Sequence, residues 1–372
     1  MNVLHIYKTC ILQSQGGVET FINTLCKFDS LLGVENKILT LSNNPENNPV
    51  KLEGYKVYQS KQIFFIASTG FSITAFLKFI KLSKEADIIH YHFPNPFADL
   101  LHLFCRPQKK TILTYHSDII RQKLFLPFYN PIRKIFLRSI DKIVATSPNY
   151  FVTSDVLQNH SQKVCVIPIG IDHSKFKKMN YERYKYWENC LKKPFFLFLG
   201  ELRYYKGLDI ALNAIKNTDI NLVIAGANGN EKKLKLLAKK QKINNVNFLG
   251  FVSEEDKVAL LNLCYGFVFP SHLRSEAFGI SLLEAATIGK PLISSEIGTG
   301  TTYINIDNET GIVVKPGSVI DLRNAMKYLL NNPEVAKKMG NAAKERSLKF
   351  FSGEKQAIAY FNLYQELINK GI

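Results

Sequence analysis

The sequence predicts an α/β protein built from two doubly wound parallel-sheet domains. Its 372 residues are enough for about two domains of ~100 to 200 residues each. Short apolar or β-branched runs alternate with longer amphipathic stretches, a rhythm that is typical of βαβ units. The rhythm stops at a polar segment near the middle of the chain and then begins again, which indicates a second sheet. Hydrophobic residues make up 46% and aromatic residues 12%, so disorder over most of the length is excluded.

Ten apolar runs are the predicted strands, five on each side of the polar segment. They span residues 3–6, 88–91, 111–114, 142–145 and 164–167, then 195–199, 221–225, 246–249, 266–269 and 291–294. Residues 353–372 predict a final helix, with an apolar stripe made of Ala357, Ile358, Phe361, Leu363, Tyr364 and Leu367.

The domain boundaries follow from this order of elements. Residues 170–193 are polar, rich in Lys and Tyr, and lack strand alternation, so the linker is expected there. We expect an N-terminal Rossmann-like domain over 1–175, a linker over 176–193 and a C-terminal domain over 194–352. The helix over 353–372 is expected to pack back on the first domain.

The chain is strongly basic and shows no sign of export. It has 48 Lys and Arg against 31 Asp and Glu, a formal net charge of +17, which predicts an anionic partner such as nucleic acid, a phosphate ligand or a membrane surface. The six cysteines include no C-x-x-C pair, which favours a reduced cytosolic protein over a zinc cluster or a disulfide framework. We expect no signal peptide, and the longest uncharged stretch, 62–77, is shorter than the ~20 apolar residues that cross a bilayer.

The densest motif follows the predicted strand 266–269 and continues into a helix that ends at Gly289. Glu276 falls in the loop and Glu284 on the helix, up to ~12 Å apart at ~1.5 Å rise per residue. The carboxylates of a glycosidase lie closer, roughly 5 to 9.5 Å apart. The pair therefore suits the two ends of an extended ligand, and Gly279 lets free amides at the helix start approach a phosphate. A nucleotide sugar has that shape.

These residues also resemble a known family. The pattern E-x-x-F-G-x-x-x-x-E after a Phe-Pro-Ser strand end resembles the retaining glycosyltransferases of family 4, whose GT-B fold has two Rossmann-like domains facing a cleft. The resemblance covers most of the chain and includes motifs at 15–19, 114–118, 166–170, 200–207 and 308–314. The segments at 91–94, 203–207 and 272–279 look most like bacterial O-antigen mannosyltransferases. This implies transfer of mannose from GDP-mannose, with retention, to an undecaprenyl-diphosphate-linked acceptor in lipopolysaccharide or related synthesis.

The resemblance implies roles for single residues. Glu276 matches a glutamate near the donor sugar and His116 a histidine that contacts the transferred sugar, so these two are the catalytic candidates. Lys206 matches the diphosphate-binding lysine, and Glu284 matches the glutamate that holds the ribose hydroxyls. The donor-binding candidates are Gly16, Gly17, Arg203, Lys206, Phe278, Gly279, Ile280 and Glu284. No metal ligand and no cofactor are expected.

Two positions depart from the family pattern. The arginine that usually follows the glycine found here as Gly200 is replaced by Glu201, and Arg203 is the candidate for its phosphate contact. The family's G-G-x-x-E loop is present as residues 298–302, with Thr302 in place of the glutamate. Glycine amides and hydroxyls can still bind phosphate there.

Two further features of the sequence each allow two interpretations. His90 and His92 share one side of a predicted strand, which fits either metal ligands or packing; no third ligand is evident, so packing is favoured. Residues 106–142 contain nine Lys or Arg and two Asp, a net +7, interleaved with large apolar residues as on interfacial helices. We expect this segment to dock on an anionic membrane, which places the enzyme in the cytoplasm, peripheral to the inner face of the cytoplasmic membrane. The other interpretation is an ordinary amphipathic helix with its apolar side in the core.

Other functions compete with mannosyl transfer. The nearest is the same fold with a UDP-sugar donor, such as UDP-GlcNAc, UDP-Glc or UDP-Gal. A non-catalytic protein that binds nucleic acid or membrane fits the charge, but no helix-turn-helix, zinc-finger or RNP-like motif accompanies it, and no nucleic-acid partner is expected. A nicotinamide-dependent dehydrogenase requires G-x-G-x-x-G after a strand, and Gly16-Gly17 lacks that spacing. A silent sugar-binding relative would be expected to lose a motif carboxylate, and both are present.

Overall fold

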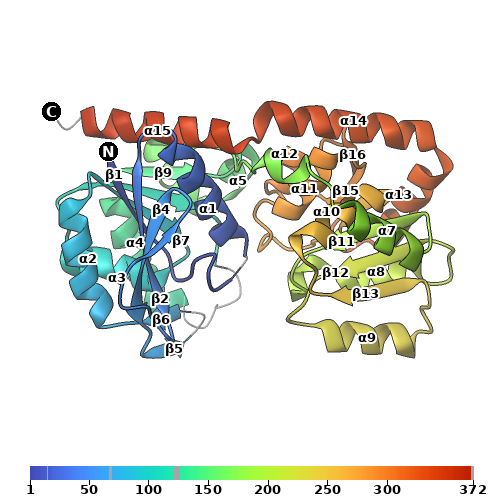
Figure 1. The fold of residues 1–372 in the computed structure, drawn as a ribbon, viewed down its shortest axis with the longest axis horizontal. Coiled ribbons are helices and arrows are strands. Elements are labelled where there is room, and N and C mark those ends of the chain that lie inside the picture. Colours follow the sequence, from blue (N-terminus) through green and yellow to red (C-terminus); the bar gives the residue numbers. More distant parts are fainter. Residues whose placement is uncertain (15, 67–68, 120–125, 370–372) are drawn as a thin grey trace. The chain divides into compact units, whose positions relative to one another are not determined.

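The computed structural model describes residues 1–14, 16–66, 69–119 and 126–369 (Figure 1). The chain divides into two compact units. The first comprises Met1–Gly170 and Ser352–Ile372, and the second comprises Ile171–Phe351. Each unit has its own parallel sheet and its own core.

The first unit is built on an eight-stranded sheet in the order β10-β9-β8-β7-β1-β2-β4-β3. Neighbouring strands are parallel, except for the antiparallel pair β3–β4 at one edge. The strands are β1 (Asn2–Ile6), β2 (Glu35–Ser42), β3 (Val50–Leu52), β4 (Tyr55–Lys61), β7 (Ile88–Phe93), β8 (Lys110–Tyr115), β9 (Lys142–Ala145) and β10 (Val164–Val166). A separate antiparallel hairpin pairs β5 (Phe64–Ile66) with β6 (Thr69–Phe71).

Helices cover both faces of this sheet. They are α1 (Gly17–Ser30), α2 (Thr74–Glu85), α3 (Pro96–Cys105), α4 (Leu126–Ser139), α5 (Pro148–Thr153), α6 (Asp155–Gln158) and α15 (Gly353–Asn369). Because side chains alternate along a strand, His90 and His92 of β7 face the rings of α1 and α15, whereas Ile6 of β1 lies on the side of α2 and α3.

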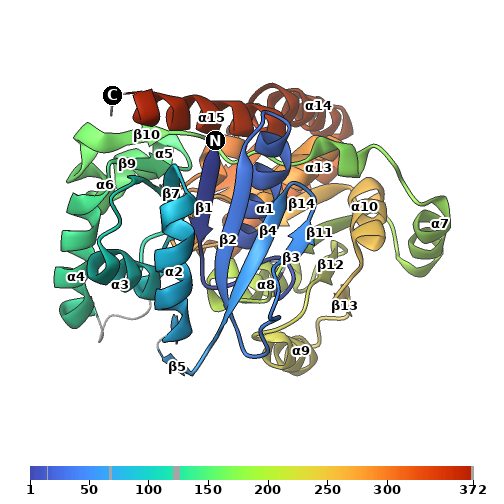
Figure 2. The same ribbon diagram turned by 60° about the vertical axis from the view of Figure 1, so that its left-hand side comes forward.

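The final helix, α15, packs on α1 (Figures 1 and 2). Its buried side is made of Gly353, Gln356, Ala357, Tyr360, Leu363, Tyr364 and Leu367. The expected stripe is wrong at Ile358, which is 48% exposed, and Phe361 is only half-buried. The 3.6-residue repeat passes through Tyr360 instead, because its hydroxyl finds a buried partner in Thr114.

The second unit has a six-stranded, fully parallel sheet in the order β13-β12-β11-β14-β15-β16. Its strands are β11 (Phe195–Leu199), β12 (Asn221–Ala225), β13 (Val246–Gly250), β14 (Gly266–Phe269), β15 (Leu292–Ser295) and β16 (Gly311–Val314). Its helices are α7 (Tyr181–Cys190), α8 (Leu208–Ile215), α9 (Glu231–Lys240), α10 (Glu254–Leu263), α11 (Ile280–Ile288), α12 (Thr301–Ile304), α13 (Val319–Asn331) and α14 (Pro333–Phe350).

The segment expected as a linker, 176–193, belongs to the second unit and contains α7. Arg183 and Trp187 of α7 both bond Oδ1 of Asp256 on α10, at 2.6 and 2.7 Å. The sequence pattern missed this helix because polar contacts, not an apolar stripe, hold it in place. The chain passes between the units at 170–171 and at 351–352.

Candidate functional site

The loop between β14 and α11 carries the main predicted motif in the second unit. Gly279 begins α11 with a positive φ of 99°, and a Cβ there would lie 3.1 Å from the Phe269 ring. No side chain caps this end, so the first amides of α11, from Ile280 onward, remain open to an anion. Phe278 is 3% exposed and packs edge-on to Phe351, so it anchors the loop from inside.

A buried ion pair lies beside this helix start. Lys206 closes a short 3₁₀ helix, η3 (Tyr204–Lys206), and its Nζ pairs with a carboxylate oxygen of Glu276. The two side chains are only 12% and 10% exposed. Ser271 Oγ donates to the same Glu276 oxygen at 3.3 Å, and the Phe269 ring lies 4.7 Å from the ammonium nitrogen. The fold thus joins two predicted residues that are 70 positions apart.

Glycine makes this approach possible. Gly207 has a φ of 68°, and a Cβ at this position would lie 2.1 Å from the carbonyl oxygen of Pro270. The backbone amide of His272 donates to the carbonyl of Tyr205 at 3.0 Å. The loops that follow β11 and β14 are therefore fastened together, which holds Lys206 against Glu276.

Glu284 lies farther along α11 and has a partner that the sequence reasoning missed. Its Oε1 lies 2.8 Å from Nζ of Lys257, which also pairs with Glu254 at 2.9 Å. Burial opposes the charge on Lys257, but the two carboxylates outweigh burial and raise the pKa of Lys257 above its usual value. One sequence signal could have pointed to Lys257. It is the capping box of Ser253 and Asp256, which starts α10 just before that lysine.

Arg203 is not part of the buried pair. Its Nε lies 2.7 Å from a carboxylate oxygen of Glu201, and its side chain is 50% exposed. Glu201, which replaces the family's usual arginine, therefore holds Arg203 at the surface of its loop.

The loop 298–302 is tied to the main motif. Arg274 donates to the carbonyl of Gly298 at 3.0 Å, and the amide of Gly300 donates to Ala277 at 2.8 Å. A Cβ on Gly300 would lie 2.4 Å from the Phe278 ring, so glycine is required for this contact. Thr302, which stands in the position of the family glutamate, bonds Glu296.

The first unit carries the other predicted residues. His116 directly follows β8, its amide donates to the carbonyl of Phe93 at 3.0 Å, and its ring is 6% exposed. Phe21 of α1 meets the His116 ring edge-on, with centroids 4.8 Å apart. Gly16 and Gly17 form the start of the same helix, so α1 links all three predicted residues.

Gly16 leaves space for a buried carboxylate. A Cβ on Gly16 would lie 2.5 Å from an oxygen of Glu19, whose other oxygen accepts a hydrogen bond from Thr9. Gln15 lies outside the described residues.

His90 and His92 are fully buried, as their predicted packing role requires, and His5 is a third imidazole beside them. His5 pairs with His90 in the register of β1 and β7, and one nitrogen of each ring lies within 4.8 Å of the others. This spacing would also suit a metal ion. The nitrogens nevertheless already have protein partners: those of His90 bond Tyr364 and Thr114, and those of His5 bond His92 and Asn36.

Comparison with known proteins identifies the chain. A family model described as "Glycosyltransferase Family 4" matches residues 15–175, and one described as "Glycosyl transferases group 1" matches 186–346. The D-rhamnosyltransferase WbpZ of Pseudomonas aeruginosa is 49% identical over 95% of this chain and 92% of its own. The chain belongs to the family 4 glycosyltransferases. The O-antigen chain mannosyltransferase C of Escherichia coli is 42% identical over 99% of both chains.

The fold agrees with this membership. The solved structure of sucrose-phosphate synthase from Thermosynechococcus elongatus matches with a TM-score of 0.84 over 99% of both chains, at 19% identity. This glycosyltransferase therefore has the GT-B fold that the sequence predicted.

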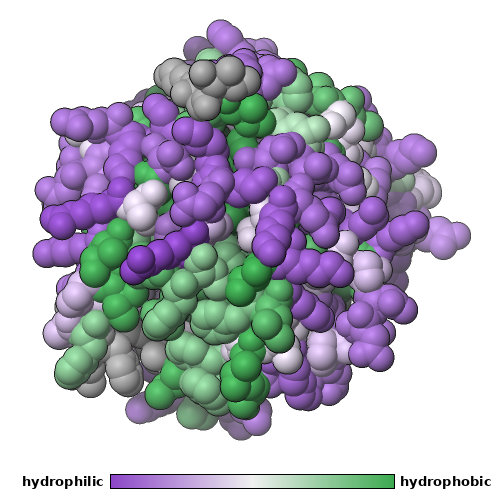
Figure 3. Space-filling view, turned by 90° about the vertical axis from the view of Figure 1, so that its left-hand side faces the viewer, coloured by the Kyte–Doolittle hydropathy of each residue, from purple (hydrophilic) through white to green (hydrophobic). Residues whose placement is uncertain are grey.

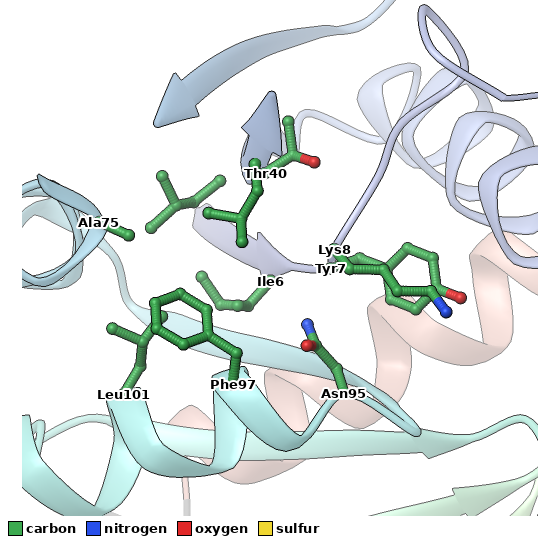
Figure 4. A pocket seen from close by; sticks show the side chains of 10 residues that line it. Ile6, Tyr7, Lys8, Thr40, Ala75, Asn95, Phe97 and Leu101 are labelled. Carbon is green, nitrogen blue, oxygen red and sulfur yellow. The ribbon is translucent and has the colours of Figure 1, made fainter. Parts of the chain in front are cut away.

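A small cavity lies beside the end of β1 in the glycosyltransferase's first unit (Figure 4). Its volume is about 10 Å³, room for about one water molecule and too small for a sugar. Asn95 Oδ1 and Thr40 Oγ1 are buried and have no hydrogen-bond partner among the described residues. Leu39 shares one side of the sheet with Ile6, so the next side chain, that of Thr40, points to the opposite side. No predicted donor-binding residue lines the cavity.

The first unit of the glycosyltransferase also has an outward apolar face (Figure 3). We define this apolar face by large side chains that are 42% to 81% exposed: Ile63, Phe64, Phe65, Ile66, Ile73, Leu77, Ile80, Phe104, Phe128 and Ile135. Beneath this face, ring contacts link Phe64 to Phe71, Phe71 to the buried Phe97, and Phe97 through Phe76 to Phe104, so aromatic packing connects the hairpin with α3.

Helix α4, from the predicted basic segment, has one side in the core and one outside. Phe136 and Leu137 are buried, whereas Phe128 is 81% and Ile135 56% exposed. Arg121, Lys123, Leu124 and Phe125 of that segment lie outside the described residues. Arg133 is half-buried near Asp99, whereas Lys134 and Arg138 are exposed. Among the described residues, no helix is long and apolar enough to span a membrane.

Proposed function

We propose that this glycosyltransferase moves mannose from GDP-mannose, with retention, to an oligosaccharide linked to undecaprenyl diphosphate in O-antigen or related polysaccharide synthesis. The observation that carries the proposal is the buried Lys206–Glu276 pair beside the open start of α11. A cation next to a departing nucleoside diphosphate offsets the charge that grows as the glycosidic bond breaks. The amides at Gly279 and Ile280 add donors for the same phosphates.

In this mechanism the acceptor hydroxyl attacks the sugar face from which the diphosphate leaves. The bond from C1 to the diphosphate oxygen breaks, the bond from C1 to the acceptor oxygen forms, and the leaving diphosphate takes the hydroxyl proton. Glu276 orients and stabilises the sugar, and Glu284 holds the nucleotide's ribose. Lys206 supplies the positive charge, so the proposal requires neither a metal nor a covalent glycosyl-enzyme.

A second candidate is D-rhamnosyl transfer, favoured by the 49% identity to a D-rhamnosyltransferase. D-Rhamnose is 6-deoxymannose, so the two donors differ by one hydroxyl. A UDP-sugar is the third candidate.

Transfer and donor hydrolysis with GDP-mannose, GDP-D-rhamnose, UDP-GlcNAc, UDP-Glc and UDP-Gal separate these candidates. We expect turnover with GDP-mannose and an axial, retained linkage by NMR. Turnover only with a UDP-sugar would refute the proposed donor, and an inverted product would refute the mechanism.

The proposed acceptor requires the enzyme to reach a membrane, and the apolar face supports this. Exposed bases, including Lys81, Lys84, Arg106, Lys134 and Arg138, lie on the same helices or at their ends. Large apolar side chains can enter the headgroup region while each nearby Lys or Arg adds about 1 kcal/mol of attraction to an anionic leaflet. We therefore propose reversible docking on the inner face of the cytoplasmic membrane.

Vesicle sedimentation tests the docking. Lys134→Ser with Arg138→Ser should weaken binding to anionic vesicles, and Phe64→Ser with Phe65→Ser should weaken it further. Arg133 is left unchanged because it is half-buried and its charge lowers the pKa of the buried Asp99, so its loss could disturb the core as well as the surface. The matched control is Lys239→Ser with Lys240→Ser on α9, at exposed positions outside the apolar face.

Binding to anionic vesicles should fall as the Debye length drops from ~10 Å at 0.1 M to ~3 Å at 1 M salt. Transfer to a lipid-linked acceptor should fall with vesicle binding, while transfer to a short soluble acceptor stays nearly constant. Equal losses on both acceptors would contradict docking.

A further inference from the structure

A chain of hydrogen bonds runs through the core of the first unit and ends at His116. His116 Nε2 lies 3.1 Å from His92 Nδ1, and His92 Nε2 lies 3.1 Å from His5 Nδ1. His5 Nε2 lies 3.1 Å from Oδ1 of Asn36, whose amide nitrogen donates to Asp29 at 2.5 Å. None of these five side chains is more than 6% exposed. The chain connects the buried side of α1 with the residue that follows β8.

Asn36 sets the direction of this chain. Its amide nitrogen faces two acceptors, the Asp29 carboxyl group and the backbone carbonyl of Cys26 at 3.3 Å. A carbonyl cannot donate, so the amide oxygen must be the atom that faces His5. The proton between His5 and Asn36 therefore belongs to His5 Nε2.

Each imidazole passes this direction to the next. A neutral imidazole has one N–H, so His5 Nδ1 accepts from His92 Nε2, and His92 Nδ1 accepts from His116 Nε2. Both ring pairs have centroids 5.4 Å apart and interplanar angles of 15° and 23°. That separation matches the hydrogen-bond length plus ~1.1 Å within each ring, so the rings lie end to end as linear hydrogen bonds require.

Burial keeps the imidazoles neutral. It lowers the pKa of His5 to about 4 and that of His116 to about 3, and it holds the pKa of His92 well below the usual value. At pH 7 each ring therefore carries one proton, which the direction of the chain assigns to Nε2.

We propose that Asn36, His5 and His92 are positioning residues that hold His116 with its proton on Nε2 and its Nδ1 as an acceptor for a hydroxyl of the donor sugar. The assignment of the sugar to His116 rests on the proposed function. The placement of the proton does not. If Nδ1 carried the proton, it would donate to the same hydroxyl instead of accepting from it. The buried chain therefore determines the direction of the hydrogen bond between His116 and the sugar.

NMR of the full chain with ¹⁵N-labelled histidine tests the placement of the proton without any donor. The His116 signals are assigned by their loss in His116→Gln. We expect an unprotonated Nδ1 and a protonated Nε2. A proton on Nδ1, or on both nitrogens, at pH 7 would overturn the proposal. So would one Zn²⁺ bound per chain that shifts the His5 and His92 signals, because their nitrogens would then ligate the metal.

A matched pair of substitutions tests the consequence for activity. His92→Gln preserves the direction, because its amide can donate to His5 and accept from His116, whereas His92→Leu breaks it. We expect the Leu variant to show mixed His116 tautomers and a kcat/KM roughly 2- to 10-fold below that of the Gln variant. The pair His5→Gln and His5→Leu repeats the comparison if His92→Leu fails to fold.

Equal activity and equal tautomers in each matched pair would overturn the proposal. Failure of the wild type to use GDP-mannose would instead refute the proposed donor and leave the NMR result standing.

Discussion

In each unit the candidate residues lie at the carboxyl end of that unit's own parallel sheet, but their surroundings are neutral in the first unit and charged in the second. In the first unit His116 ends a buried chain of neutral groups. In the second unit the Lys206–Glu276 and Lys257–Glu284 pairs bring charge into the interior. The difference teaches that one fold, used twice, can present a neutral surface suited to sugar hydroxyls and a charged one suited to a diphosphate.

The buried carboxyl groups follow the same division. Burial raises the pKa of Asp29 to about 7 and that of Asp99 to about 8, so these two buried carboxyl groups of the first unit are largely protonated in mild acid. The second unit instead pairs its buried Glu276 and Glu284 with lysines and its buried Asp256 with Arg183. Stability of the two units should therefore respond differently to pH.

The largest expected effect is a selective loss of stability of the first unit in mild acid. Burial lowers the pKa of His5, His90, His92, His102 and His116, so these five take up protons on unfolding below pH 6.5. Asp29 and Asp99 release protons on unfolding between about pH 4 and their folded pKa values, which works in the opposite direction. Near pH 5 the net uptake from these seven groups is close to three protons, worth on the order of 4 kcal/mol per pH unit.

Stability of the first unit should thus fall as the pH drops below 6.5. Throughout residues 171–351, all described, the two histidines His173 and His272 are only half-buried. Trp187, the single tryptophan, lies in the second unit and reports its unfolding by fluorescence, while circular dichroism reports both units. Coincident transitions at pH 5 would contradict the contrast between the units.

The next effect concerns the charged site. Glu276→Gln keeps the shape but removes the negative charge that pairs with Lys206 and that, in the proposed mechanism, stabilises the donor sugar. We expect kcat to fall roughly 100- to 1,000-fold, as for loss of one preorganised transition-state contact. Steady-state kinetics measure this, with the exposed Glu345→Gln as the control. Turnover within twofold of wild type would remove Glu276 from the mechanism.

Lys206→Ala should lower kcat/KM by roughly 10- to 150-fold, the value of one charge-assisted hydrogen bond to the leaving diphosphate. It also leaves Glu276 buried without its cation, so the Trp187 transition should move to lower temperature. Adding Glu276→Gln should restore that stability but not the activity. Wild-type activity should survive EDTA. Loss of activity in EDTA would indicate that a metal, not Lys206, neutralises the diphosphate.

The smallest effect is expected at Glu284. Glu284→Gln should raise KM for the nucleotide donor about 5- to 10-fold with little change in kcat, because the ribose does not react. Lys257 keeps Glu254 as a partner, so folding should be preserved. Titration with GDP by calorimetry measures the weaker binding, and a fall in kcat alone would contradict a nucleotide-holding role.

The sequence predicted all ten strands that it named, with boundaries within two residues. It missed β2 and β4, whose apolar runs are interrupted by polar residues, and the short strands β3, β5, β6 and β16, which have only three or four residues. It also missed α7, which polar contacts hold in place. It also favoured packing for His90 and His92 without finding His5. That residue lies in a short run 85 positions away, and only the pairing of β1 with β7 brings it near.

The sequence by itself determined the two parallel sheets, the motif from Phe269 to Glu284 and the family, because strand periodicity and motif spacing are local properties of the chain. Only the tertiary structure decided that Lys206 meets Glu276, that Lys257 meets Glu284, that Glu201 holds Arg203 at the surface, and that His5 joins His92. Such pairs depend on strand order and on the close backbone approach at Gly207, which packing of the whole unit fixes. The same packing removes water from these groups, and desolvation sets which of them are charged.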